Sequence, residues 1–370
     1  MSATKTYTAK LIFTGEQWLH EHAAIVAAGI ITDVVAVTAL DPQTEVVHFG
    51  DSILAPAFID LQLYGAYEKL FSVYADTESL QLLNRYSNNG GAAFCMPTVA
   101  TNQPEVLYKC IDAISTYWQN GGEGILGLHA EGPWINKTKR GAHIESLIHS
   151  PSLQEVEALL DHGKGVVKII TLAPEVCSKE VIDLIHAAGI KIFAGHSNAT
   201  YEEAMQSFNN GITAVTHLYN AMSPLLHRNP GLTGATLDNP KIMASIIADG
   251  FHVDYAAIRI AKKIMKERLF ALTDAVTKTT EGYYQHLPEG DKYSADNILS
   301  GSALTMYKAL QNLVMHVGIE TGEALRMCSL YPAQVMGLDD KLGMVAKGYR
   351  SNMVLLPELL NSIDELCIIS

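Results

Sequence analysis

The chain has 370 residues, 48% of them hydrophobic and 18% charged, which excludes a disordered chain and allows a large buried core. Its formal net charge of −13 argues against a nucleic-acid binder, and an anionic substrate would need positive charge concentrated locally. Five cysteines without a C-x-x-C pair, no targeting segment and no membrane-length apolar run predict a cytoplasmic protein with reduced thiols and no membrane partner.

Short β-like runs occur at both ends of the chain. The first group is interrupted by glycines and reads as a meander, with runs at residues 11–13, 23–27 and 30–37. The second group lies at residues 343–348 and 352–356. We expect the two ends to pair into one small β-sandwich domain, formed by residues 1–54 and 343–370.

Between the ends, strand-like and helix-like segments alternate, which is typical of a parallel sheet with crossover helices. Eight strands are predicted, at residues 57–63, 92–98, 124–129, 166–172, 190–194, 212–216, 242–248 and 269–273. Eight strands close a (β/α)8 barrel of the TIM type, so residues 55–342 are predicted to form this α/β barrel.

Two segments carry helical signals. Thr200 and Glu203 have the spacing of a capping box, in which the side chain of each residue bonds the backbone N–H of the other. Apolar residues at 304, 307, 310, 313 and 314 have the spacing of one helix face.

Four of the predicted strands are followed by a residue with metal-binding or acid/base chemistry. Glu131 follows the third strand, His196 the fifth, His217 the sixth and Asp274 the eighth. Each residue alone has an ordinary explanation, because strand-end histidines often pack and a Thr-Asp pair can cap a helix. The carboxyl ends of barrel strands form one face, however, so the four side chains are expected to converge there.

The residue types suggest how the chemistry is divided. Glu131, His196 and His217 are a typical ligand set for one divalent ion that leaves a position open for water. Asp274 is then the candidate general base, which takes a proton from water and returns it to the leaving group.

Six motifs follow one another in a characteristic order. They are residues 128–134, 171–175, 195–200, 216–222, 247–254 and 299–302. Together they resemble the N-acetylglucosamine-6-phosphate deacetylases of the amidohydrolase superfamily, from about residue 55 to residue 343 and in the flanking β segments.

The resemblance implies hydrolysis of the 2-acetamido group of a 6-phosphorylated amino sugar, in amino-sugar catabolism. It implies one divalent ion per subunit on Glu131, His196 and His217, with zinc preferred and iron, manganese or cobalt as alternatives. Asp274 would be the acid/base, and His143 would polarise the amide carbonyl. From the sequence alone, His143 is as readily an ordinary loop histidine.

The resemblance also implies residues that contact the substrate. Asn220, Ala221, Arg228 and His252 match positions that contact the sugar phosphate, and Arg228 would come from the neighbouring subunit of a homodimer. His252 alone could equally be an ordinary loop histidine. Gln62 is expected to bind the substrate.

Two stretches depart from the expected pattern. Many amidohydrolases have His-x-His at the end of the first strand, whereas this chain has Gln62 and Tyr64, so a second ion is not expected. Residues 276–282 also differ from the usual sequence.

Three other functions stay open. An amidohydrolase acting on a different N-acyl sugar fits the same residues. A cyclic-amide hydrolase would use a modified lysine at the end of the fourth strand, but Lys168 lies inside that strand and is interpreted as structural. A barrel without catalysis would be expected to lack Asp274 or a ligand, and this chain keeps them.

Overall fold

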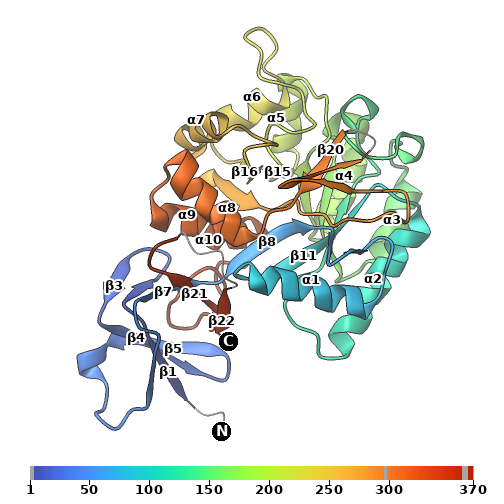
Figure 1. Cartoon of the computed structure of the whole chain (residues 1–370). Helices are drawn as coiled ribbons and strands as arrows, with labels where there is room; N and C mark the ends of the chain where they lie inside the picture. The colour runs from blue at the N-terminus through green and yellow to red at the C-terminus, as the bar shows by residue number, and fades with distance from the viewer. Residues whose placement is uncertain (1–3, 296–297, 361–365, 370) are drawn as a thin grey trace. The chain divides into compact units, whose positions relative to one another are not determined.

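The computed structural model of the chain describes residues 4–295, 298–360 and 366–369 (Figure 1). The chain divides into two compact units, with residues 1–60, 87–94 and 305–370 in unit 1 and residues 61–86 and 95–304 in unit 2. Parts of the predicted domains (1–3, 296–297, 361–365 and 370) lie outside the described residues, and the predicted boundaries themselves stay a prediction. Within the described ranges, no helix is long and apolar enough to cross a membrane.

An eight-stranded parallel sheet forms the predicted barrel. Its strands lie in chain order: β8 (Phe58–Leu63), β11 (Ala92–Ala100), β12 (Leu128–Glu131), β13 (Val167–Leu172), β14 (Lys191–Ala194), β15 (Ala214–Val215), β16 (Met243–Ile247) and β17 (Leu269–Leu272). The first and last strands meet at their carboxyl ends. Leu63, the last residue of β8, pairs in parallel with Ala275 beyond β17, and the Tyr64 N–H donates to the Ala275 carbonyl at 2.9 Å. The (β/α)8 fold class is therefore confirmed.

The strands are buried on both faces, as near-continuous apolar runs in a parallel sheet should be.

The largest difference between the predicted and the observed strands is in the third strand, because β12 begins at Leu128 instead of residue 124. Gly124 and Gly127 have φ of +82° and +144°, far from the φ of about −120° in a regular parallel strand. The strand continues through Glu131, which pairs with Ala100 and Thr171, so this carboxylate ends the strand instead of following it.

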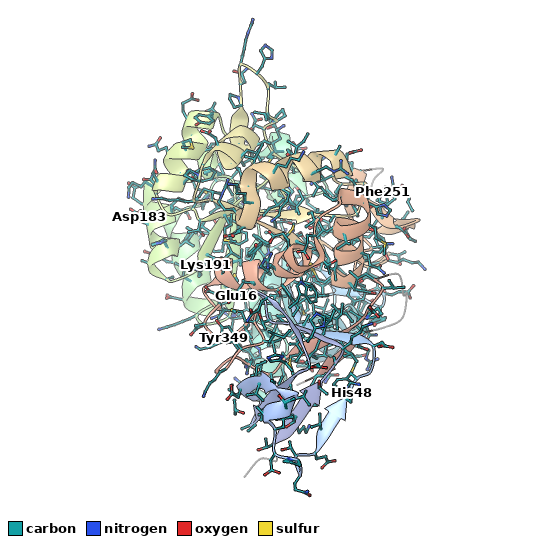
Figure 2. All side chains as sticks on the ribbon, turned by 90° about the vertical axis from the view of Figure 1, so that its left-hand side faces the viewer. Glu16, His48, Asp183, Lys191, Phe251 and Tyr349 are labelled. Carbon is teal, nitrogen blue, oxygen red and sulfur yellow. The ribbon has the colours of Figure 1, made fainter. Side chains whose placement is uncertain are left out.

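Helices connect the strands and lie outside them in unit 2 (Figure 1). They are α1 (Thr77–Asn89), α2 (Pro104–Gln119), α3 (Leu153–His162), α4 (Lys179–Ala187), α5 (Tyr201–Asn209), α6 (Gly231–Asp238) and α7 (Tyr255–Met265). The predicted capping box is present at α5, where Thr200 Oγ1 accepts from the Glu203 N–H and Glu203 Oε2 accepts from the Thr200 N–H. Asp183 on α4 and Phe251 after β16 lie at the surface of this unit (Figure 2).

Two small antiparallel sheets extend the loops of the first and last barrel strands. One joins β9 (Gly65–Ala66) to β10 (Lys69–Leu70). The other contains β18 (Leu287–Glu289), β19 (Lys292–Ala295) and β20 (Ile298–Ser302). The sequence analysis did not predict the second sheet, because its strands are three to five residues long and largely polar.

Unit 1 contains two further sheets in its described part. The first has the order β5 (Ile30–Ala36), β4 (His22–Ala27), β1 (Lys5–Thr8), β6 (Val46–His48). The second has the order β22 (Cys367–Ile369), β21 (Met353–Pro357), β7 (Ser52–Pro56), β2 (Leu11–Phe13), β3 (Trp18–His20). Both sheets contribute to one apolar core, which confirms that the two chain ends form a small β-sandwich.

Of the two β runs predicted near the C-terminus, the one at residues 343–348 is wrong. Residues 343–348 form turns, because Gly343 and Gly348 have φ of +90° and +92°. Helices α8 (Met306–Asn312), α9 (Thr321–Cys328) and α10 (Leu330–Met336) complete this unit, and residues 313–317 continue α8 as a π-helical turn.

Candidate active site

A cavity of about 320 Å³ lies in unit 2 at the carboxyl ends of the barrel strands. Eight residues expected at the site line it: Glu131, His143, His196, His217, Asn220, Ala221, His252 and Asp274. Such a concave site at this end of a barrel is where ligands usually bind. Two other expected residues, Gln62 and Arg228, are not among its lining residues.

Sharp backbone turns aim three of these side chains. His196, His217 and Asp274 follow the ends of β14, β15 and β17 within two residues, and their φ angles are +47°, +36° and +54°. Non-glycine residues rarely adopt this left-handed conformation, and it is concentrated at functional sites. Here it turns the chain abruptly at the strand end.

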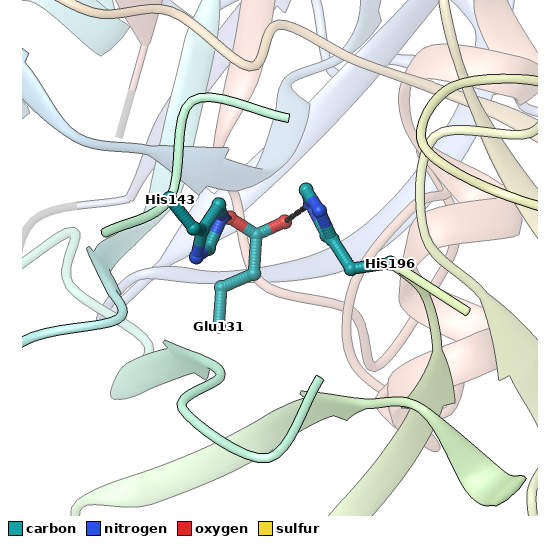
Figure 3. Close-up of side chains that lie close together, drawn as sticks. All are labelled: Glu131, His143 and His196. Atoms are coloured by element: carbon teal, nitrogen blue, oxygen red, sulfur yellow. Dashed lines mark hydrogen bonds and ion pairs between the residues drawn. The ribbon is translucent and has the colours of Figure 1, made fainter. Parts of the chain in front are cut away.

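The Glu131 carboxylate lies between imidazoles, two of which are shown with it in Figure 3. Its Oε1 is 3.1 Å from His217 Nε2 and 3.3 Å from His196 Nε2, and the two nitrogens are 3.2 Å apart. Ligand atoms about 2.0 to 2.2 Å from one tetrahedral ion lie about 3.3 to 3.6 Å from each other. The three atoms therefore have nearly the separations that one divalent ion requires.

His196 is held in the tautomer that a metal ligand needs. Its Nδ1 is 3.0 Å from the Lys139 carbonyl oxygen, so Nδ1 carries the proton and Nε2 keeps its lone pair. The backbone N–H of His217 donates to Ser245 Oγ at 2.7 Å, while His217 Nδ1 has no hydrogen-bond partner among the described residues.

His143 lies on the other side of Glu131 (Figure 3), and ligand atoms of Glu131, His143 and His196 all lie within 4.8 Å of one another. The Thr101 N–H donates to His143 Nδ1 at 3.3 Å, however, which places the His143 proton on Nε2. That Nε2–H donates to Glu131 Oε2 at 3.1 Å. A nitrogen that carries a proton cannot bind a cation, so His217 completes the ligand set better than His143.

Burial and charge set the protonation states of this cluster. Burial would raise the pKa of Glu131, but His196, His143 and His217 outweigh it and hold that pKa well below its usual range. Burial, with a smaller effect of His196, lowers the pKa of His143 to about 4, and burial also lowers that of His217. The cluster therefore combines an ionised Glu131 carboxylate with neutral imidazoles at His143 and His217, and a divalent cation binds carboxylates and imidazoles in these forms.

Gln62 and Tyr64 complete the surroundings of Glu131 and Asp274. Gln62 is fully buried, and its Nε2 lies 3.0 Å from Glu131 Oε1 and 2.7 Å from Asp274 Oδ1. Tyr64 donates its hydroxyl hydrogen to Glu131 Oε2. Burial, then Glu131 and Asp274, raise the pKa of Tyr64 well above its usual value, so the phenol keeps its proton.

The cavity is also lined by His252, Asn220 and Ala221. Asp249 orients His252 by accepting from its Nδ1 at 2.6 Å and from its backbone N–H at 2.8 Å. Gly250 between them has a φ of +78°, and a Cβ there would lie 2.8 Å from the Tyr255 ring. Only glycine fits this turn without displacing the aromatic ring.

Arg228 lies on the exposed loop between β15 and α6, outside the cavity. Lys168 lies inside β13 and is not a lining residue either. The position of Lys168 gives no support to a lysine-bridged metal pair at the end of the fourth strand.

The sequence analysis missed several residues that hold or line the site. Thr101 and Lys139 orient the two loop histidines, and Glu175 joins three loop residues by accepting from Asn136 Nδ2, Ser197 Oγ and the Asn198 N–H at 2.6 to 2.9 Å. Tyr284 and His286 stack at 6.1 Å between ring centroids and line the cavity. Among Thr101, Lys139, Glu175, Tyr284 and His286, only Glu175 had a signal in the sequence, because it lies in the motif at residues 171–175.

Two family models match the chain. The amidohydrolase family matches residues 53–367, and the NagA composite domain matches residues 7–50. The two matched segments together span both units and contain every residue of the candidate site.

Individual relatives are similar over nearly the whole chain. The N-acetylglucosamine-6-phosphate deacetylase of Haemophilus influenzae is 32% identical and aligns with 93% of this chain and 92% of its own. The N-acetylgalactosamine-6-phosphate deacetylase of Escherichia coli O157:H7 is 30% identical, with 95% of each chain aligned. The solved structure of N-acetylglucosamine-6-phosphate deacetylase from Pasteurella multocida has a TM-score of 0.93 at 31% identity and covers 99% of this chain and 98% of that one.

Proposed function

The chain belongs to the amidohydrolase family, and we propose that it hydrolyses the acetamido group of N-acetylglucosamine 6-phosphate to acetate and glucosamine 6-phosphate. The observation that carries this proposal is the cluster of Glu131, His196 and His217 beside Asp274 in one cavity. The names of the relatives supply the substrate class.

We assign one divalent ion per chain to Glu131 Oε1, His196 Nε2 and His217 Nε2, because these atoms have the spacing and protonation states of a ligand set. Zinc is our first choice, with iron, manganese or cobalt as alternatives. When bound, the ion supplies Lewis-acid activation of water and of the amide carbonyl.

Asp274 is assigned the proton transfers. Its carboxylate takes a proton from the attacking water as the new C–O bond forms at the acetyl carbon. It then gives that proton to the amide nitrogen as the C–N bond breaks, so that the amino sugar leaves as a neutral amine. One residue thus acts first as a base and then as an acid.

His143 is assigned to the carbonyl oxygen of the substrate. Its Nε2–H points at Glu131 Oε2 in the free cavity, and its proton is fixed on Nε2 by the Thr101 N–H. A neutral N–H donor at this position can transfer its hydrogen bond to the carbonyl oxygen as negative charge develops there.

Asn220, Ala221 and His252 are assigned to the sugar phosphate. Lys139 is the one lysine or arginine among the described residues that line the cavity, so a dianion needs a further cation. We propose that Arg228 of a second copy supplies this cation in a homodimer, because Arg228 is exposed on a loop and lies outside its own cavity.

Gln62 is still assigned to substrate binding, although its contacts here are with Glu131 and Asp274.

We also propose a cytoplasmic location. The five cysteines are free thiols, and three of them, Cys95, Cys110 and Cys328, are buried. Unpaired thiols are typical of a reducing compartment.

The experiment is to measure acetate and free amine from a substrate panel with zinc-loaded protein. The panel contains the 6-phosphates of N-acetylglucosamine and N-acetylgalactosamine, unphosphorylated N-acetylglucosamine and a cyclic amide. We expect N-acetylglucosamine 6-phosphate to have the highest kcat/KM. The galactosamine relative makes N-acetylgalactosamine 6-phosphate the second candidate, and a preference for it would change the sugar assignment. Preferred turnover of the cyclic amide, or no turnover of any compound, would refute the proposal.

A further inference from the structure

Tyr64 is a buried phenol beside the metal-binding carboxylate, with 9% of its surface exposed. Its ring packs against Leu70, Val276 and Tyr284 in an apolar cluster. Its backbone is fixed on both sides, because the Tyr64 N–H donates to the Ala275 carbonyl and its own carbonyl accepts from the Phe71 N–H, both at 2.9 Å. The side chain therefore has little freedom to move.

The hydroxyl of Tyr64 is as constrained as its ring. It accepts from Gln62 Nε2 at 2.7 Å and donates its hydrogen to Glu131 Oε2. The same Oε2 accepts from His143 Nε2–H at 3.1 Å. Two donors thus occupy Oε2, while Oε1 faces His196 and His217 and lies 3.0 Å from Gln62 Nε2.

We infer that Tyr64 is a positioning residue that makes Glu131 a single-oxygen metal ligand, by holding Oε2 in a hydrogen bond and leaving Oε1 to the cation. The inference rests on the metal site assigned under the proposed function. A carboxylate without such a partner can rotate and bind a cation through both oxygens, whereas hydrogen-bond partners of metal ligands fix their orientation.

The need for Tyr64 increases during the proposed reaction. His143 gives its hydrogen bond to the carbonyl oxygen of the substrate at that stage, so Oε2 loses one of its two donors. Tyr64 is then the donor that keeps the carboxylate in place. The apolar cluster around its ring holds the phenol at this position.

The test compares two variants that each remove one buried phenol hydroxyl. Tyr64→Phe removes the donor to Glu131. Tyr117→Phe is the matched control, because Tyr117 is 6% exposed, lies on α2 and donates to the Glu123 carbonyl at 2.8 Å outside the cavity. The metal-free full-length proteins are titrated with Zn²⁺ against a chelating dye, and Co²⁺ is then bound to record its visible absorption.

Tyr64→Phe should raise the Kd for Zn²⁺ by about 10- to 100-fold, since removal of a hydrogen-bond partner of a metal ligand typically lowers metal affinity by this factor. The Co²⁺ absorption should weaken, as it does when a carboxylate supplies a second oxygen and the coordination number rises. Tyr117→Phe should keep the wild-type Kd and spectrum. These readouts need no sugar, so they stand even if the substrate assignment fails.

A Tyr64→Phe protein with wild-type Zn²⁺ affinity and Co²⁺ spectrum would overturn the inference. Equal weakening in both variants would also overturn it, because that result would indicate general destabilisation. A wild-type protein that binds neither ion would refute the metal site and the role of Tyr64 together.

Discussion

At the scale of single residues, three buried histidines of unit 2, His129, His143 and His286, stay neutral because they are buried. Burial lowers the pKa values of His129 and His286 to about 4, as it does for His143. His129 lies in the barrel interior and bonds the Leu61 carbonyl and Thr171 Oγ1, so its role is structural. Neutral imidazoles inside the protein make its stability depend on pH.

We predict that the free energy of unfolding falls as the pH falls from 6.5 to 4. Between these values the unfolded chain binds protons that the buried histidines of the folded chain do not. For His286, a pKa lowered from 6.5 to about 4 is worth roughly 3 kcal/mol over this range. His286→Gln should therefore flatten the pH dependence measured by urea unfolding in EDTA.

His20→Gln is the control, because His20 is exposed in unit 1. It should leave the slope of stability against pH unchanged. An unchanged slope in His286→Gln would show that this histidine does not contribute.

Site residues could be predicted when a side chain with metal-binding or acid/base chemistry lies at the end of a predicted strand. Glu131, His196, His217 and Asp274 have this property, and the structure brings all four to one cavity. Thr101 and Lys139 could not be predicted in this way. Lys139 contacts His196 through a backbone carbonyl, which every residue possesses, and Thr101 contacts His143, 42 positions away, through its N–H and its Oγ1. Tyr64 was considered only as a poor metal ligand, and its hydrogen bond to Glu131 depends on a distance that no local pattern contains.

At the scale of secondary-structure elements, helix α5 stabilises the loop that carries His196. The helix begins after Thr200, four residues beyond that histidine, and the capping box satisfies two backbone N–H groups at its start. The Glu175 carboxylate holds the intervening residues Ser197 and Asn198. Loop and helix start thus form one continuous hydrogen-bonded segment.

Thr200→Ala should lower the free energy of unfolding by about 1 kcal/mol, because the N-cap oxygen is lost. Thr200→Ser keeps that oxygen and should stay within a few tenths of a kcal/mol of wild type. Urea unfolding of the three proteins measures the difference. Equal stability of Thr200→Ala and wild type would mean that the cap does not limit the stability of this helix.

The predicted elements agree with the structure where an apolar run in the sequence also pairs with neighbouring strands in a sheet. All eight barrel strands were predicted from apolar runs, and seven of them begin within two residues of the prediction. The run at residues 343–348 has a β-like composition, but positive φ at Gly343 and Gly348 turns the chain instead. The sheet of β18 to β20 is held together by pairing between short polar segments, which have no periodicity of their own.

At the scale of the whole molecule, the proposed substrate carries a phosphate dianion, whereas the chain has a net charge of −13. Among the described residues that line the cavity, Lys139 is the one lysine or arginine. The proposed Arg228 from a second copy would make the active site a property of the dimer.

Arg228→Ala should raise KM for N-acetylglucosamine 6-phosphate by roughly thirtyfold or more, because truncating one partner of a charged contact costs about 2 to 5 kcal/mol. Activity on the unphosphorylated sugar should barely change. Lys164→Ala removes an exposed charge of the same unit and should leave KM unchanged.

Mixing inactive Asp274→Asn subunits with Arg228→Ala subunits tests whether Arg228 acts in trans. One site of each mixed dimer would then contain both native residues, so activity should return on mixing. Heterodimers that form without any gain in activity would place Arg228 outside the partner's site.

The measurement that tests the central claim most directly compares wild type with Asp274→Asn, with zinc content and acetate release from N-acetylglucosamine 6-phosphate determined on the same samples. The substitution keeps the size of the side chain but removes the base. Asp274→Asn should keep one zinc per chain and release acetate about 10²- to 10⁴-fold more slowly than wild type. Acetate release at the wild-type rate by zinc-loaded Asp274→Asn would contradict the proposed mechanism.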